Sequence, residues 1–171
     1  GILNLGGNAI FMSSSDLQLS RGEPVSDTAK VASSMLDVIA LRVDKHETLD
    51  MFAANSSVPV INALSDLSHP CQILADLMTF KENSVSELEK VCWIGDGNNV
   101  CNSYIEASKI LDFELSIYCP KEYSPDPSFL NYAKENSSFA NSREEAAKGA
   151  DIITTDVWVS MGDEKTKERA F

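Results

Sequence analysis

The sequence predicts an α/β fold built from doubly wound parallel sheets. Short apolar runs of strand length alternate with helical patterns along all 171 residues. A polar and charged stretch over residues 81–90 interrupts this alternation once. Polar side chains follow several predicted strands, as they do at the ligand-binding edge of open parallel sheets. These observations favour two adjacent domains, residues 1–82 and 83–171, with a cleft between them.

Three strands and three helices are expected in the first domain. The expected strands are residues 9–12, 38–41 and 58–61. The expected helices are residues 26–36, residues 46–54 and a segment opened by His69. Ser26 is placed to cap the first helix, whose apolar face would contain Thr28, Val31, Ala32 and Met35. The third helix would bury Ile73, Leu74, Leu77 and Met78.

The second domain continues the same alternation. The expected strands are residues 91–94, 114–119 and 151–157. Helices are expected over residues 98–111 and in a segment that begins with Asp126-Pro127. A short helix capped by Ser142 and Glu145 should end at Gly149, and a charged segment after residue 163 should form a further helix.

Composition excludes several classes of partner. Acidic residues exceed basic ones by 26 to 14, giving a net charge of −12, so no basic stripe is available for nucleic acid or an anionic membrane. No apolar run approaches the ~18 residues of a membrane span. The four cysteines form no CxxC pair and there are two histidines, so we expect no metal site and reduced thiols. The first residues resemble neither a signal nor a transit peptide.

The strongest local motif is His69-Pro70-Cys71-Gln72. Proline at the first helical turn places His69 and Gln72 on the same side of a helix start. That helix end also offers backbone N–H groups and a partial positive charge. The motif therefore suits a small anionic molecule with a carbonyl group. The alternative is that His69 only caps its helix.

Further candidates follow strands or lie in loops. Arg42 and Asn62 end neighbouring strands, where an arginine can bind a carbonyl or phosphate oxygen, although Arg42 could also be a surface residue. Gln18 lies in a loop-like stretch. Asp156 ends the last strand before Ser160-Met161-Gly162, and its carboxylate can hold a substrate ammonium group.

The turn Gly95-Asp96-Gly97-Asn98-Asn99 superficially matches a dinucleotide-binding loop. Val100 occupies the third glycine position and no acidic residue is placed for a ribose, so we expect no nicotinamide cofactor. The turn can still present Asn99 to the cleft.

Taken together, these motifs and the segment around residues 21–31 resemble the transcarbamylase family, and the Asp156–Gly162 string resembles its ornithine branch. The resemblance covers essentially the whole chain. It implies transfer of a carbamoyl group from carbamoyl phosphate to the side-chain amine of L-ornithine, giving L-citrulline and phosphate, a step of arginine metabolism, without a cofactor. It also implies a cytoplasmic homotrimer, or a multiple of trimers.

The resemblance assigns a role to each candidate residue. Arg42, His69 and Gln72 would be catalytic and bind carbamoyl phosphate, and Gln18 would reach the carbamoyl phosphate of a neighbouring subunit. Residues on the ornithine side would be Asn99, Asp156, Ser160 and Met161.

Two segments typical of the family are absent from the sequence, a phosphate-binding Ser-x-Arg-Thr and a later His-Cys-Leu-Pro. The chain is therefore expected to be an internal fragment in which both domains are incomplete, and which is inactive alone. Two alternatives stay open. One is a sister enzyme acting on aspartate, putrescine or acetylornithine, and the other is a catalytically silent binding subunit. The sequence does not fix the direction of the pathway.

Overall fold

The computed structural model describes residues 1–13 and 22–157. The chain divides into two compact units, the first formed by residues 1–41 and 47–61, the second by residues 42–46 and the chain from Asn62 on. Within the described residues, no helix combines the length and the apolar character needed to cross a bilayer.

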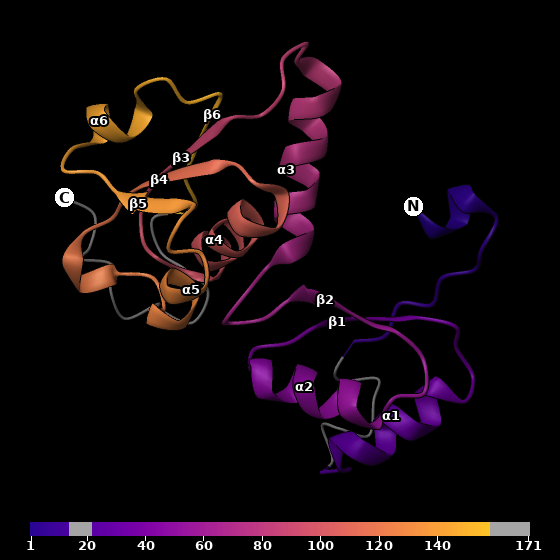
Figure 1. The fold of residues 1–171 in the computed structure, drawn as a ribbon. Coiled ribbons are helices and arrows are strands. Elements are labelled where there is room, and N and C mark those ends of the chain that lie inside the picture. The colour runs from indigo at the N-terminus through magenta and orange to yellow at the C-terminus, as the bar shows by residue number, and fades with distance from the viewer. Residues whose placement is uncertain (14–21, 158–171) are drawn as a thin grey trace. The chain divides into compact units, whose positions relative to one another are not determined.

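The first unit contains helices that pack on a small sheet (Figure 1). Its elements are the 3-10 helix η1 (Ile2–Leu5), α1 (Val25–Ser33), β1 (Ile39–Arg42), α2 (His46–Asn55) and β2 (Val60–Leu64). Residues 42, 46 and 62–64, at the ends of β1, α2 and β2, are assigned to the second unit. Ala29, Ile39 and Phe52 form its buried core. Burial of such apolar side chains is the main force that holds small helices on a two-stranded sheet.

Three predictions for this unit are wrong in whole or in part. Residues 9–12 form no strand, and Phe11 is 92% exposed. An apolar run becomes a strand only where a neighbouring strand satisfies its backbone groups. The first helix begins one residue before Ser26, because Pro24 has the N-cap position and its carbonyl accepts from the N–H of Thr28. Val31 and Met35 of the predicted apolar face are exposed.

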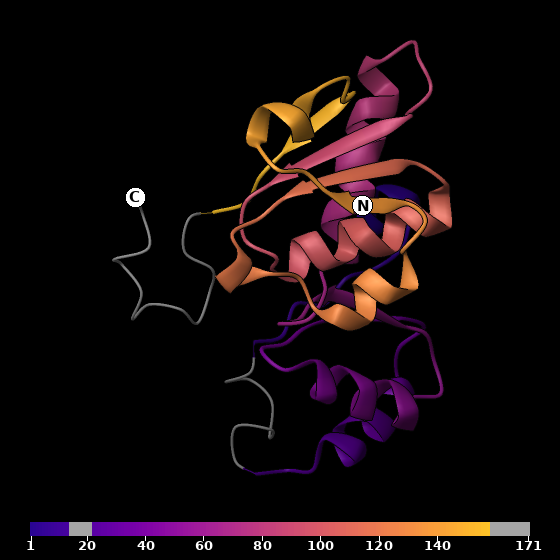
Figure 2. The same ribbon diagram turned by 60° about the vertical axis from the view of Figure 1, so that its left-hand side comes forward.

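The second unit contains a four-stranded parallel sheet in the order β5-β4-β3-β6. Its strands are β3 (Lys90–Ile94), β4 (Glu114–Tyr118), β5 (Ser137–Phe139) and β6 (Ile152–Thr154). Its helices are α3 (Pro70–Asn83), α4 (Asn99–Leu111), η3 (Lys121–Tyr123), α5 (Pro127–Tyr132) and α6 (Arg143–Ala147). Helices α4 and α6 lie on opposite faces of the sheet (Figures 1 and 2), as in a doubly wound fold.

The core of this unit lies around the central strands. Trp93, Tyr104, Leu115 and Ile117 are completely buried there. Because both faces of β3 are covered, its three middle residues, 91–93, are all buried, which explains why this strand has a continuous apolar run instead of an alternating one.

Most predicted elements of this unit are confirmed, including two helix caps. The Asp126 carboxylate accepts from the Ser128 N–H, and the Ser142 hydroxyl accepts from the Glu145 N–H. The strand β5 was not predicted, since it has only three residues at an edge. The predicted buried face of α3 is wrong in part, because Leu74 and Met78 are exposed. The helix predicted after residue 163 lies outside the described residues.

The strand order determines where a ligand can bind. From β3 the chain moves outward to β4 and β5, and then returns to β6 on the other side of β3. The connection after β3 leads to one side of the sheet, whereas β6 lies on the other side of β3. At such a reversal of strand order, a crevice forms beyond the carboxyl ends of the two neighbouring strands, here β3 and β6.

Candidate active site

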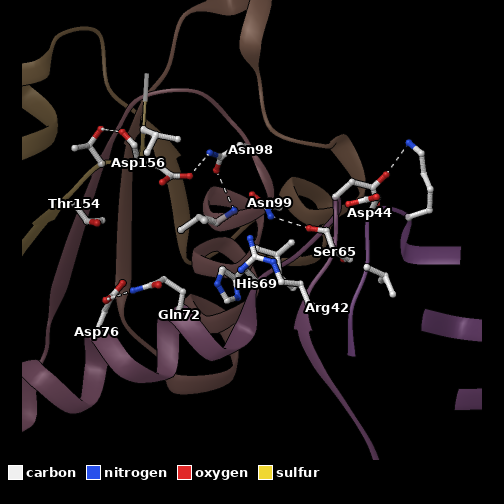
Figure 3. A pocket seen from close by; sticks show the side chains of 17 residues that line it. Arg42, Asp44, Ser65, His69, Gln72, Asp76, Asn98, Asn99, Thr154 and Asp156 are labelled. Atoms are coloured by element: carbon white, nitrogen blue, oxygen red, sulfur yellow. Dashed lines mark hydrogen bonds and ion pairs between the residues drawn. The ribbon is translucent and has the colours of Figure 1, made fainter. Parts of the chain in front are cut away.

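A cavity of about 970 Å³ lies beyond these strand ends. Every residue that lines it belongs to the second unit. Five of the predicted site residues line it together, and all five are labelled in Figure 3: Arg42, His69, Gln72, Asn99 and Asp156. The predictions for Gln18, Ser160 and Met161 lie outside the described residues. The sequence therefore brought together groups that lie up to 114 positions apart along the chain.

The start of α3 contributes two of these side chains. His69 is the N-cap residue and Pro70 follows in the first turn, as predicted. The alternative that the His69 side chain only caps its helix is wrong, because this side chain makes no capping hydrogen bond although the residue has the N-cap position. The backbone instead holds the residue in place, since the His69 N–H donates to the Ser103 hydroxyl at 2.7 Å. The imidazole is thereby available to the cavity.

The environment of His69 favours the neutral imidazole. Burial lowers the pKa of His69 from its ordinary value of 6.5, and the positive charge of Arg42 lowers it further. Asp156 and Asp76 act in the opposite direction, but the net effect on the pKa is a decrease. The Nδ1 atom is buried without a hydrogen-bond partner in the described part of the chain. A neutral imidazole can donate one hydrogen bond without being consumed as an acid.

The start of α4 contributes the amides on the other side. The side-chain oxygen Oδ1 of Asn98 accepts hydrogen bonds from the backbone N–H groups of Val100 and Cys101, so this residue caps the helix. Its amide nitrogen donates to Asp156 Oδ2 at 2.7 Å (Figure 3). Asn99 donates from Nδ2 to the Ser65 carbonyl at 2.8 Å. The capping asparagine therefore ties the carboxylate at the end of β6 to the start of α4.

Arg42 lines the cavity from the end of β1. An ion pair between Lys45 and Asp66 lies in the loops that follow β1 and β2. Lys45 Nζ lies 3.0 Å from Asp66 Oδ2, and the His46 N–H donates to the other oxygen of Asp66 at 2.8 Å. Both groups of this pair are well exposed, so water weakens their attraction. The pair fixes the loops that follow β1 and β2.

Two residues of the cavity, Asn98 and Asp76, were not predicted from the sequence, and the predicted position of Asn62 is wrong. Asn98 carried a detectable signal, because asparagine directly before a helical pattern is a preferred N-cap. Asp76 also lines the cavity and lies four residues after Gln72, the spacing at which helical side chains meet. Asn62 does not end its strand: β2 continues to Leu64, and the Asn62 amide donates to the Ser68 hydroxyl at 2.9 Å.

The glycine turn after β3 has a structural explanation. A Cβ atom at Gly97 would lie 2.1 Å from the backbone nitrogen of Pro125, so only glycine fits there. The close contact between the two chain segments explains why glycine occurs at position 97, so a bound dinucleotide is not needed to explain it. No group of three or more His, Cys, Asp or Glu residues suited to a metal ion occurs within residues 1–13 and 22–157.

The cavity combines features suited to two different ligand groups. Arg42 and a neutral His69 supply donors for an anion that carries a carbonyl group. Asn99 and Asp156 supply an amide and a carboxylate, which suit an amino acid with its ammonium group. Such a site, at the strand ends of a doubly wound sheet, defines a class of proteins that can bind an acyl-type anion beside an amine.

Comparison with protein families gives this class its name. Residues 1–82 match the carbamoyl-phosphate-binding domain of aspartate/ornithine carbamoyltransferase, and residues 88–171 match the aspartate/ornithine-binding domain. The chain belongs to the aspartate/ornithine carbamoyltransferase family.

Individual relatives belong to the ornithine branch. The chain is 53% identical over 170 residues to the ornithine carbamoyltransferase of Pseudomonas syringae pv. tomato, covering 99% of this chain and 56% of that protein. The anabolic ornithine carbamoyltransferase of Campylobacter jejuni superposes with a TM-score of 0.90 at 49% identity, covering 98% of this chain and 58% of that one. The enzyme from Pyrococcus furiosus gives a TM-score of 0.87 at 41% identity, with coverages of 98% and 56%. The chain thus spans somewhat more than half the length of these relatives.

Proposed function

We propose that the protein containing this chain transfers a carbamoyl group from carbamoyl phosphate to the side-chain amine of L-ornithine, producing L-citrulline and phosphate. The observation that carries this proposal is the single cavity lined by Arg42, His69 and Gln72 together with Asn99 and Asp156. The names of the relatives support ornithine as the acceptor and arginine biosynthesis as the setting.

Arg42 and His69 polarise the carbamoyl carbonyl. Attack by the neutral amine of ornithine forms a C–N bond and moves the carbonyl electrons onto oxygen. The guanidinium and the imidazole N–H donate to this oxyanion as its charge develops. The oxyanion then collapses, the bond from carbon to the phosphate oxygen breaks, and phosphate leaves with that electron pair and accepts the proton lost by the amine. Gln72 holds the carbamoyl amide during these steps.

Asp156 and Asn99 bind the amino-acid end of ornithine. Asp156 accepts from the α-ammonium group, while Asn98 holds the carboxylate through its other oxygen. The side-chain amine of free ornithine has an ordinary pKa of about 10, so binding must favour its neutral form. Fixing the α-ammonium end aims the other end of the substrate at the carbamoyl carbon, which contributes through orientation.

The remaining predicted assignments are part of the same proposal. We propose that Gln18 binds the carbamoyl phosphate of a neighbouring subunit, and that Ser160 and Met161 close over ornithine. We also propose a domain boundary between residues 82 and 83, assembly as a homotrimer or a multiple of trimers, and a cytoplasmic location.

The proposal is tested by measuring citrulline formation with carbamoyl phosphate and a panel of amines: ornithine, aspartate, putrescine and N-acetylornithine. We expect a clear preference for ornithine. Replacement of His69 by glutamine should lower kcat by about 10² to 10³, the usual effect of removing an oxyanion donor. Asp156→Asn should instead raise the KM for ornithine by about tenfold or more.

A preference for another amine would reassign the protein to a sister enzyme. Binding of carbamoyl phosphate with no turnover on any amine would favour the silent binding subunit. The isolated 171-residue chain, whose sequence contains no Ser-x-Arg-Thr segment, should bind carbamoyl phosphate weakly and form no citrulline. A protein that contains this chain together with a Ser-x-Arg-Thr segment has the same residues Arg42, His69 and Gln72. Its activity relative to the 171-residue chain therefore measures what the phosphate-binding segment contributes.

A further inference from the structure

The side-chain amide of Gln72 has a defined orientation. Its nitrogen Nε2 donates to Asp76 Oδ1 at 2.9 Å, one helical turn further along α3. An ionised carboxylate only accepts hydrogen bonds, so the amide nitrogen must face Asp76. The amide oxygen Oε1 then points away from Asp76. Gln72 lines the cavity, and it therefore presents an acceptor there (Figure 3).

Asp76 is itself fixed by a side chain from another helix. The Tyr104 hydroxyl donates to Asp76 Oδ2 at 2.7 Å. Tyr104 belongs to α4, is completely buried, and lies with its ring centroid 5.9 Å from that of Trp93. Each oxygen of Asp76 thus has its own donor, and the carboxylate cannot rotate without losing one of them. The tyrosine is anchored in the core of the unit.

Tyr104 stays a hydrogen-bond donor at all ordinary pH values. Burial raises its pKa well above the usual range, and the hydrogen bond to Asp76 and the charge of Asp76 raise it further. A hydrogen bond with the Thr154 side chain has a smaller, opposite effect on the pKa. Thr154 also lines the cavity. Hydrogen bonds therefore connect Asp76 of α3, Tyr104 of α4 and Thr154 at the end of β6.

We propose that Asp76 and Tyr104 are positioning residues that make the cavity selective for an acyl phosphate bearing an NH₂ group. This inference rests on the proposed function, in which Gln72 meets the carbamoyl amide. A fixed Oε1 accepts from a carbamoyl NH₂ and gains nothing from a methyl group in its place. If the Gln72 amide turned over, its own NH₂ would meet the carbamoyl NH₂, and two donors would face each other.

Two stable analogues of carbamoyl phosphate test this selectivity. Phosphonoacetamide and 2-oxopropylphosphonate have the same charge and differ only in an NH₂ or a CH₃ group beside the carbonyl. Their inhibition constants against carbamoyl phosphate would be measured in the protein that contains this chain. We expect the unaltered protein to prefer phosphonoacetamide by about tenfold, the value of one hydrogen bond.

Asp76→Asn should reduce this preference to about twofold or less. Asparagine offers one acceptor and one donor, so both orientations of the Gln72 amide become available. Tyr104→Phe should give an intermediate preference, since Asp76 keeps its charge but loses the group that fixes it. Glu82→Gln is the matched control on the same helix, and Tyr132→Phe removes an exposed hydroxyl. Both controls should keep the full preference.

Equal weakening of the two analogues in folded Asp76→Asn would mean a purely structural role and would overturn the inference. A tenfold preference retained in that variant would overturn it as well. If Asp76→Asn does not fold, Tyr104→Phe decides, because it removes a single oxygen atom: an unchanged preference there refutes the inference. If the unaltered protein forms no citrulline and binds neither analogue, the proposed function itself fails, and the inference falls with it.

Discussion

Asn98 holds two parts of the site with one side chain, and its replacement separates their contributions. Its oxygen accepts from the N–H groups of Val100 and Cys101 at 3.0 and 3.1 Å, and its nitrogen donates to Asp156 at 2.7 Å. Asn98→Ala removes both functions. Loss of an N-cap costs about 1–2 kcal/mol, and loss of a donor to a half-exposed carboxylate adds about 1 kcal/mol. We expect the free energy of unfolding to fall by about 2–3 kcal/mol at every pH tested.

Asn98→Asp keeps the cap but replaces the donor by a second carboxylate. Two negative charges about 4 Å apart repel by about 1–4 kcal/mol between a water-like and a surface-like dielectric. The repulsion raises the pKa of the pair in the folded state above the usual value near 4. The folded protein then binds more protons than the unfolded chain, so stability is retained in acid and lost as pH rises through the raised pKa.

Urea unfolding followed by circular dichroism at pH 5 and pH 8 measures both effects. Asn98→Asp should be close to the unaltered protein at pH 5 and clearly less stable at pH 8. The double variant Asn98→Asp with Asp156→Asn has one carboxylate again, and its pH dependence should disappear. If Asn98→Asp loses the same stability as Asn98→Ala at both pH values, Asn98 and Asp156 are not coupled and the reasoning is refuted.

Three further results are expected. Gly97→Ala should lower the free energy of unfolding by about 3 kcal/mol or more in the same assay, because the added Cβ overlaps Pro125. At Gly149 the added Cβ meets open space, so Gly149→Ala should cost only about 1 kcal/mol for its positive φ. Equal losses in the two variants would contradict this explanation. In native protein, a thiol reagent should modify the exposed Cys71 quickly, the partly buried Cys119 more slowly, and the buried Cys92 and Cys101 only on unfolding, since burial raises the pKa of these last three thiols. Because the pKa of His69 is lowered, stability should fall as pH drops below about 6.5, and His69→Gln should reduce that dependence; an unchanged pH profile would speak against a buried neutral imidazole.

The sequence alone determined the class of fold and pointed to five of the residues that line the cavity. Apolar runs such as 91–94 and 114–118 define strands by local composition, and caps such as Asp126 and Ser142 act within a few residues, so both were predictable. The motif around His69 was predictable for the same reason, because Pro70 and the helix start are local features.

Tertiary structure decided what depends on partners far away in the chain. Residues 9–12 have strand-like composition but form no strand, and Leu74 and Met78 have helical spacing but stay exposed, since burial depends on what packs against them. The hydrogen bond from Tyr104 to Asp76 joins residues 28 positions apart and has no local signal, unlike the bond from Gln72 to Asp76 within one helix. Hydrogen bonds of this kind form only after the helices have packed, and packing geometry is what a sequence pattern does not contain.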